Sequence, residues 1–262
     1  MSELEGRRLL VVGASSGSGR ASAIAFVRHG AQVAFSARRR GQLDEAVAEA
    51  GGGVVVEIDV CDQISIGAGV TEAADRLGGL DGVLYTAGMS PIARLSKLTL
   101  EQWTTIFAVN AFGPSLVTAA ALPYLSEDSI VAVMSSDSAA QPRHSLVAYA
   151  AAKCALEATM EGWRTEEIGG RRFLTVVIGP TQPTGFADSF SPEDFVELVP
   201  HWQRQGFKTG LLAADDVAEH LATTFASMYA APTLGIETLL LRAPEPVIAV
   251  SDFGGSTHTD PD

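Results

Sequence analysis

Short apolar runs alternate along this chain with longer segments in which apolar residues recur at helical spacing. The short runs read as strands buried on both faces, because they carry few polar residues between apolar ones. They are residues 9–12, 32–36, 54–58, 82–85, 130–134, 174–178 and 237–241. The longer segments predict helices over residues 18–29, 41–50, 63–77, 99–122, 147–161 and 214–229.

This regular alternation predicts an α/β protein with a doubly wound parallel sheet and right-handed crossovers. We expect about seven strands in a three-layer α/β/α arrangement. No internal repeat or linker divides the chain, so a single domain is expected over residues 1–250. Residues 180–210 interrupt the alternation as a long inserted loop, and the polar residues 251–262 are expected to form a tail.

A glycine-rich turn, Gly13-Ala14-Ser15-Ser16-Gly17-Ser18-Gly19, joins the first predicted strand to the first helix. Such a turn can bind phosphate, because glycines let the backbone approach a pyrophosphate and the helix N-terminus offers free N–H groups. The spacing differs from the commoner Gly-x-Gly-x-x-Gly, so a plain surface turn stays the alternative. The residues expected to contact a dinucleotide are Gly13, Ser15, Ser16, Gly17, Ser18 and Gly19.

The end of the second predicted strand indicates which dinucleotide binds. A carboxylate there would bond the ribose of NAD, whereas an arginine accommodates the 2′-phosphate of NADP. Here Arg38 and Arg39 follow the strand and no acid does, which favours NADP(H) over NAD(H). A solvated, basic start of the next helix is the alternative. Asp59 and Val60, after the third strand, lie at the same sheet edge and could contact adenine, unless Asp59 caps a helix.

Tyr149 and Lys153 stand four residues apart in the Ala-rich segment 147–161, which predicts a helix. Residues at this spacing share one helix face. An ammonium beside a phenol favours the phenolate and lowers the tyrosine pKa from about 10, which gives an acid/base for neutral pH. A surface tyrosine beside a solvated lysine is the alternative. It is disfavoured because only three of the 18 basic residues are lysines.

In this order the motifs resemble the short-chain dehydrogenase/reductase family, in its shorter, single-domain branch. The resemblance spans about residues 6–241 and implies a Rossmann-like fold that interconverts a carbonyl and a secondary alcohol with NADP(H). The implied catalytic residues are Asn110, Ser136, Tyr149 and Lys153. Beyond the residues already named, the implied cofactor contacts are Ala87, Gly88, Tyr149, Lys153, Pro180 and Thr184.

The resemblance also implies a role for each catalytic side chain. Tyr149 exchanges the proton on the substrate oxygen, and Ser136 hydrogen-bonds that oxygen. Lys153 lowers the pKa of Tyr149 and binds the nicotinamide ribose. Asn110 holds a water that relays protons to Lys153, and Thr184 holds the nicotinamide carboxamide. Plainer roles stay open for two of these residues, with Ser136 as a strand-end cap and Asn110 as a structural polar contact.

Three short segments, five residues in all, depart from the family pattern. Val12 replaces a threonine, Tyr85-Thr86 replaces Asn-Asn, and Gly179-Pro180 inverts Pro-Gly. None of them removes a group that moves a proton. They leave open a non-catalytic, NADP(H)-binding regulatory protein of the same fold. A nucleotide-sugar epimerase or dehydratase would share the Tyr-Lys chemistry, but it would need a larger region after residue 180.

The inserted loop 180–210 is unusually rich in apolar side chains: Phe186, Phe190, Phe195, Val199, Trp202 and Phe207. We expect it to cover an apolar substrate, with Phe186, Phe190 and Trp202 in contact with that substrate. Core or subunit packing is the alternative. Ser191-Pro192 predicts the start of a short helix in this loop, because serine is a good cap and proline suits the first helical position.

Composition narrows the partners and the location. The net charge of −13 disfavours nucleic acid and anionic membranes. No uninterrupted apolar run reaches the roughly 18–20 residues that span a bilayer, and residues 1–5 lack the shape of a signal peptide. Cys61 and Cys154 are expected as free thiols in the cytoplasm, Cys154 in the core. No metal is expected. The resemblance suggests a homodimer or homotetramer, formed through helices near 100–120 and 147–168.

Overall fold

The computed structural model describes residues 4–167, 169–184, 186, 190–205 and 210–244. Seven parallel strands form one sheet in the order β3-β2-β1-β4-β5-β6-β9. Their bounds are β1 Arg8–Val12, β2 Gln32–Ala37, β3 Val54–Glu57, β4 Leu80–Tyr85, β5 Leu125–Ser136, β6 Arg172–Ile178 and β9 Thr238–Leu241. Two short strands, β7 Thr181–Gln182 and β8 Leu212–Ala213, pair separately. The predicted doubly wound α/β class is confirmed.

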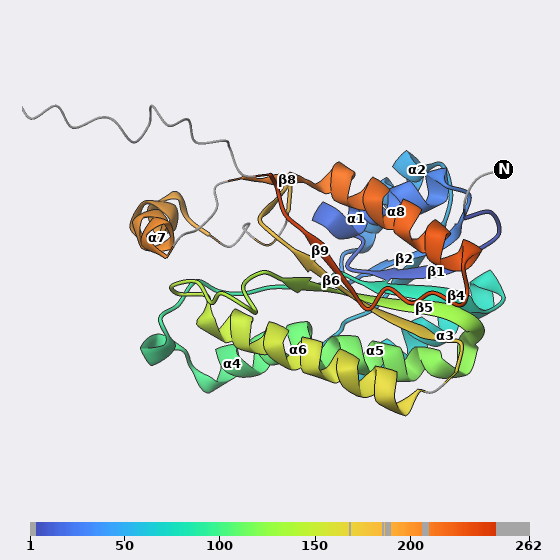
Figure 1. Ribbon diagram of the computed structural model, residues 1–262, viewed down its shortest axis with the longest axis horizontal. Coiled ribbons are helices and arrows are strands. Elements are labelled where there is room, and N and C mark those ends of the chain that lie inside the picture. The colour runs from blue at the N-terminus through green and yellow to red at the C-terminus, as the bar shows by residue number, and fades with distance from the viewer. Residues whose placement is uncertain (1–3, 168, 185, 187–189, 206–209, 245–262) are drawn as a thin grey trace, which may run out of the picture.

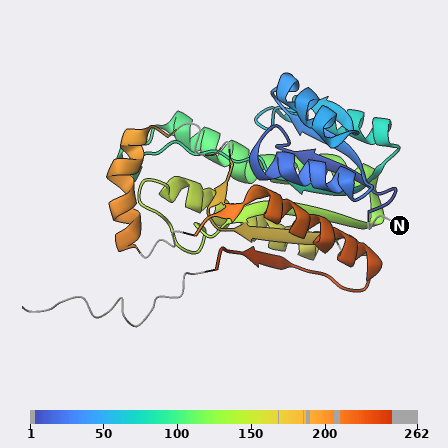
Figure 2. The same cartoon turned by 90° about the horizontal axis from the view of Figure 1, so that it is seen from above.

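Helices cover both faces of the sheet and create two apolar cores (Figure 1). On one face lie α1 Gly17–Arg28, α2 Arg40–Ala50 and α8 Ala214–Ala230. On the other lie α3 Gln63–Leu77, α5 Gly113–Ala121 and α6 Val147–Glu166, with α4 Leu100–Phe107 beside α6. The remaining helix, α7 Pro192–Arg204, lies beyond the end of the sheet, as Figure 2 shows from a second direction.

Local sequence signals account for several helix boundaries. Thr99 and Gln102 form the expected capping box at the start of α4, with bonds of 3.2 Å and 3.0 Å. Ser191 caps α7 and proline occupies its first turn, as predicted. The αL residues Gly51 and Gly78 end α2 and α3.

The predicted helix over residues 99–122 is not uniform. Between α4 and α5 the chain makes a π-helical turn, Ala108–Phe112, and α5 ends in a 3-10 turn, Leu122–Tyr124. The run Leu100–Tyr124, whose most apolar 18-residue window has a mean hydropathy of 1.5, is long and apolar enough to cross a membrane by length and composition alone. Half of its most apolar window is buried inside the protein, as in a core helix, so the run is weak support for a membrane span.

Both cysteines are free, as expected, but Cys154 is exposed rather than packed in the core. Its thiol donates to the carbonyl of Ala139 at 3.3 Å. The prediction failed because Cys154 points about 100° away from Lys153 around the helix. Whether that direction faces the core or the solvent depends on what packs against α6.

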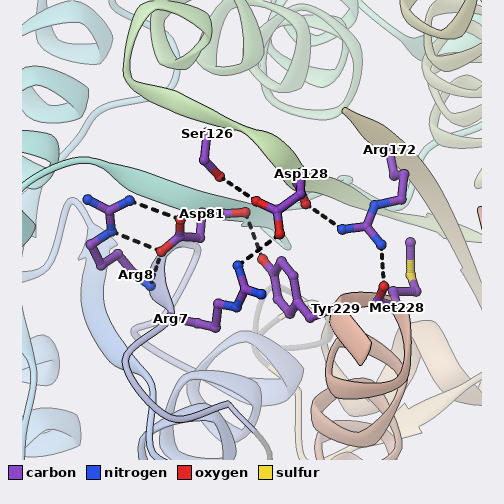
Figure 3. A network of polar contacts seen from close by, with 8 residues as sticks. All are labelled: Arg7, Arg8, Asp81, Ser126, Asp128, Arg172, Met228 and Tyr229. Carbon is purple, nitrogen blue, oxygen red and sulfur yellow. Dashed lines mark hydrogen bonds and ion pairs between the residues drawn. The ribbon is translucent and has the colours of Figure 1, made fainter. Parts of the chain in front are cut away.

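A polar network ties the amino-terminal ends of the central strands together (Figure 3). The guanidinium of Arg8 bonds both carboxylate oxygens of Asp81, each at 2.9 Å, and the hydroxyl of Tyr229 donates to the carbonyl of Asp81 at 2.7 Å. Arg172 donates to the carbonyls of Asp128 and Met228. The network therefore joins β1, β4, β5 and β6 to the end of α8, at the edge opposite the carboxyl ends of the strands.

Candidate active site

A cavity of about 1210 Å³ opens at the carboxyl ends of the strands. This is larger than a typical pocket for one small ligand. Most residues predicted to bind cofactor or substrate line it: Gly13, Ser15, Ser16, Ser18, Arg38, Arg39, Asp59, Val60, Ala87, Gly88, Ser136, Tyr149, Lys153, Pro180, Thr184, Phe186, Phe190 and Trp202. Gly17 and Gly19 belong to the glycine-rich turn that carries Gly13, and Asn110 is fully buried next to Gly88 in the cavity wall. The fold thus brings together residues far apart in the chain.

The glycine turn is compact because Thr86 closes over it. A Cβ on Gly13 would lie 2.5 Å from the hydroxyl oxygen of Thr86, and a Cβ on Gly19 would collide with the same oxygen. Gly13 also has a φ of +97°, which favours glycine. The N–H and hydroxyl of Thr86 both donate to the carbonyl of Val12, at 2.8 Å and 2.9 Å. The carbonyl of Val12 and the side chain of Thr86 therefore connect the ends of β1 and β4, and both residues depart from the family pattern.

The start of α1 has the features of an anion site. Its first turn carries no acidic residue, and the side chain of Ser16, its N-cap, makes no capping bond within the described chain. The guanidinium of Arg39 donates to the hydroxyls of Ser15 and Ser16, at 3.1 Å and 3.4 Å. A cation therefore lies beside the positive end of the helix dipole. These residues fit the phosphates of a dinucleotide.

Asp59 follows β3 at the wall of the cavity. Its carboxylate accepts from the N–H of Cys61 at 3.0 Å, whereas the side chain that caps α3 belongs to Asp62. The helix-cap alternative for Asp59 is therefore wrong. Asp59 instead shapes the loop that carries Val60 and faces the same cavity as the glycine turn.

The predicted catalytic side chains meet at the inner end of the cavity. Ser136 ends β5, is 8% exposed, and lies close enough to Tyr149 on α6 to lower the pKa of its hydroxyl. Its oxygen also accepts from the N–H of Ser138 at 3.1 Å, so the strand-end role exists beside the contact with Tyr149. Lys153, 2% exposed, donates to the carbonyl of Met134 at 2.8 Å, and its Nζ lies 5.5 Å from the centroid of the Tyr149 ring.

Burial dominates the protonation of this pair. It raises the pKa of Tyr149 to about 12, although the hydrogen bond from Ser136 and the charge of Arg143 act in the opposite direction. It lowers the pKa of Lys153 to about 7, against the attraction of Glu157. The expected lowering of the Tyr149 pKa by Lys153 is therefore not found, because burial outweighs the other contributions and Lys153 is not among the groups that shift this pKa. The amino group of Lys153 donates instead to the carbonyl of Met134.

Asn110 lies in the π-helical turn and is fully buried. Its Nδ2 donates to the carbonyls of Met89 and Ile106, both at 2.8 Å. Its Oδ1 has no protein partner among the described residues. A Cβ on Gly88 would lie 3.2 Å from this Oδ1 and 4.0 Å from Nζ of Lys153. The amide oxygen and the ammonium therefore face the same small space above Gly88.

Aromatic side chains form the outer end of the cavity. The ring of Phe186 packs against Tyr149 with centroids 4.9 Å apart, and Phe190 packs against Phe186 at 5.6 Å. Trp202, on α7, is 6% exposed and donates from its indole N–H to the carbonyl of His144 at 2.9 Å. Val199 also lines the cavity. The side chain of Phe195, and Phe207 as a whole, lie outside the described residues.

The segment after β6 passes next to the glycine turn. A Cβ on Gly17 would lie 3.1 Å from Cα of Thr184. The hydroxyl of Thr184 accepts from the N–H of Phe186 at 3.1 Å. Pro180, whose carbonyl accepts from Leu212 at 2.8 Å, anchors the pairing of β7 with β8. The inverted pair Gly179-Pro180 is therefore fixed by backbone hydrogen bonds, from Gly179 to Leu241 and from Leu212 to Pro180.

An ion pair that the sequence reasoning missed lies beside Ser136. One nitrogen of Arg143 contacts both carboxylate oxygens of Asp137 at 2.8 Å, and both residues line the cavity. The two side chains are 16% and 15% exposed. Asp137 directly follows Ser136, which is a signal that could have drawn attention to it. The spacing to Arg143 matches no helix or strand period, so their pairing depends on the loop.

Comparisons with known proteins agree with this geometry. A sequence model of the family described as short chain dehydrogenase matches residues 7–193. The uncharacterized oxidoreductase YghA of Escherichia coli (strain K12) is 37% identical over 160 residues, which are 58% of this chain and 54% of that protein. The match spans little more than half the length of the first curated relatives.

Two solved structures share the fold at 25% identity. One is a short chain dehydrogenase from Burkholderia cenocepacia J2315 in complex with NADP, with a TM-score of 0.79 over 92% of this chain and 98% of that one. The other is an alcohol dehydrogenase from the archaeon Thermococcus sibiricus complexed with 5-hydroxy-NADP, with a TM-score of 0.77 over 92% and 99%. The chain therefore belongs to the short-chain dehydrogenase/reductase family of oxidoreductases.

Proposed function

We propose that this chain is an NADP(H)-dependent oxidoreductase that interconverts a carbonyl and a secondary alcohol, with Tyr149 as the acid/base. The observation that carries the proposal is that Ser136, Tyr149 and the buried Lys153 line one cavity, with Nζ of Lys153 5.5 Å from the centroid of the Tyr149 ring. In the same cavity Arg38 and Arg39 lie beside the glycine turn. Bound NADPH would supply a hydride for reduction of the carbonyl carbon.

The chain's own residues would manage the proton. Because burial raises the pKa of Tyr149 to about 12, its phenol is protonated at neutral pH and can give a proton to a carbonyl oxygen. Ser136 would hydrogen-bond the same oxygen and stabilise charge that develops there. Lys153, whose pKa burial lowers to about 7, lies close enough to the phenol to help restore its proton. Oδ1 of Asn110 would accept a hydrogen bond on the path to Lys153.

The cofactor preference rests on the residues after β2. Arg38 and Arg39 both line the cavity, and Arg39 is held by Ser15 and Ser16 at the start of α1. A guanidinium there suits the 2′-phosphate of NADP. The NADP-bound structural neighbours support this proposal for the present chain, because they share its fold over most of its length.

An apolar substrate is proposed from the outer end of the cavity. Phe186, Phe190 and Trp202 place aromatic carbon around the approach to Tyr149. The ion pair of Asp137 with Arg143 adds polar groups to the cavity wall, but the two charges already compensate each other. A small to medium ketone or aldehyde with an apolar body would bury its surface against these rings.

A homodimer or homotetramer and a cytoplasmic location are proposed as well. Leu100 and Phe112, in the helical run next to α6, are 82% and 55% exposed and would be available to pack against another subunit. The free thiols of Cys61 and Cys154 suit a reducing compartment.

The test is NADPH and NADH consumption with a panel of apolar ketones, aldehydes, quinones and ketosteroids, for the wild type and Tyr149→Phe. We expect Tyr149→Phe to lower kcat at least about a hundredfold, because it removes the proton donor. The Kd of NADPH should stay within about threefold, because the ring is kept. Unchanged turnover in Tyr149→Phe would refute the assignment. Tight NADPH binding without turnover of any carbonyl would favour the regulatory alternative.

A further inference from the structure

Tyr85, at the end of β4, occupies a position where the family resemblance leads us to expect asparagine. Its side chain is 1% exposed, and its hydroxyl donates to the backbone carbonyl of Val109 at 2.7 Å. Val109 immediately precedes Asn110 in the π-helical turn Ala108–Phe112. One side chain therefore connects the sheet edge to the turn that carries Asn110.

The carbonyl of Val109 needs this donor because of the π-helical turn. In an α-helix the N–H of Gly113 would donate to Val109, four residues earlier. Here it donates to the carbonyl of Ala108 instead. The next residue, Pro114, has no N–H and cannot extend the π pattern to Val109. A partly buried carbonyl left without a donor is costly, and the hydroxyl of Tyr85 reduces that cost.

Gly113 makes room for this hydroxyl. A Cβ on Gly113 would lie 2.6 Å from the hydroxyl oxygen of Tyr85. Its φ of −53° is ordinary for a helix, so glycine is required by space and not by conformation. Burial raises the pKa of the Tyr85 phenol well above its ordinary value, so the group stays a hydrogen-bond donor at any pH at which the protein works.

The register of this turn decides where Asn110 points. A change from π to α hydrogen bonding alters the helical phase by about 100° for the one residue involved. Oδ1 of Asn110 would then no longer share the space above Gly88 with Nζ of Lys153. Such π-helical turns are rare and are often found at functional sites.

We propose that Tyr85, together with the space left by Gly113, is a positioning residue that holds the π-helical turn and so directs Oδ1 of Asn110 toward Lys153. The kinetic consequence rests on the proposed function, whereas the structural consequence does not. The two can therefore be tested separately on the full-length chain.

The structural test compares hydrogen exchange in Tyr85→Phe and Tyr124→Phe. Tyr124 is a matched control, because its hydroxyl bonds Thr71 at 3.0 Å near the other end of α5. We expect the amides of residues 108–113 to exchange about tenfold faster in Tyr85→Phe, as the loss of one hydrogen bond of about 1.4 kcal/mol allows. These amides should be unchanged in Tyr124→Phe. Equal effects in both variants, or no effect in Tyr85→Phe, overturn the proposal.

A second structural arm uses the contact with Gly113. Gly113→Ala should lower the Tm less in the Tyr85→Phe background than in the wild type, because the hydroxyl that the new Cβ would meet is gone. Equal losses of Tm in the two backgrounds overturn the packing part of the proposal.

The kinetic arm requires a substrate from the panel above. We expect Tyr85→Phe to lower kcat about tenfold with KM values within about twofold, and to shift the pH profile of kcat, because the proton path through Asn110 is misaligned. A wild-type kcat and pH profile in Tyr85→Phe overturns the catalytic consequence. If the wild type turns over no carbonyl, the proposed function fails, while the exchange and Tm arms still decide the role of Tyr85.

Discussion

Arg39 should decide which nicotinamide cofactor the protein binds. Its guanidinium is exposed and already held against Ser15 and Ser16, at 3.1 Å and 3.4 Å, next to the N-terminus of α1. A 2′-phosphate placed there would receive charge-assisted hydrogen bonds, which are worth about 1.5–3 kcal/mol when well shielded from water. Because the site is exposed, we take about 1–2 kcal/mol, which is roughly 5- to 30-fold in affinity. NADH has no phosphate at this position.

The perturbation is Arg39→Gln, measured by equilibrium titration of NADPH and NADH. The Kd of NADPH should rise roughly 5- to 30-fold and that of NADH by less than about twofold. Added salt should weaken NADPH binding more in the wild type than in the variant, because it screens the lost interaction. Arg40→Gln is the matched control, since Arg40 pairs with Glu57 at 3.1 Å and with Asp44 at 3.9 Å. A similar loss of affinity for both cofactors, or an equal effect of Arg40→Gln, would show that Arg39 does not recognise the 2′-phosphate.

Two further predictions concern stability and the glycine turn. Burial disfavours the charged form of Asp81, but the hydrogen bonds from Arg8 outweigh burial and hold the carboxyl pKa below its ordinary value. The carboxylate therefore stabilises the fold above about pH 4, and this contribution is lost as the pH falls below about 4. Asp81→Asn should therefore lower the free energy of unfolding by about 1–3 kcal/mol at pH 7. In urea titrations the difference in unfolding free energy between wild type and variant should shrink below about pH 4. A difference that stays constant with pH would contradict this prediction. Gly13→Ala should abolish measurable NADPH binding or folding, because the new Cβ would lie 2.6 Å from the backbone nitrogen of Ala87. Gly41→Ala is the control, because Gly41 has open space around it. This control should behave as wild type in the NADPH titration and in thermal melts.

Local patterns were enough to predict the order of the elements and most of the residues at the cavity. Strand and helix periodicity, the caps at Thr99 and Ser191, and the spacing of Tyr149 and Lys153 each act within a few residues of chain. Parallel strands then bring their carboxyl ends to one edge, so residues that follow different strands converge without any long-range information in the sequence.

The directions of the pKa shifts of Tyr149 and Lys153 could not be predicted from local sequence patterns. Four-residue spacing places Lys153 near Tyr149, but the direction of each pKa shift is set mainly by burial, which the spacing does not reveal. For the same reason the exposure of Cys154 was predicted wrongly. The predicted tail over residues 251–262 lies outside the described part of the chain.

The fold class, the glycine turn, the basic end of β2 and the Tyr-Lys pair could be predicted from the residues alone, because each depends on neighbours along the chain or along one helix. The directions of the Tyr149 and Lys153 pKa shifts, the pairing of Asp137 with Arg143, and the bond from Tyr85 to the turn that carries Asn110 emerged only from the folded chain. These depend on burial and on contacts between segments distant in sequence, which no local pattern encodes.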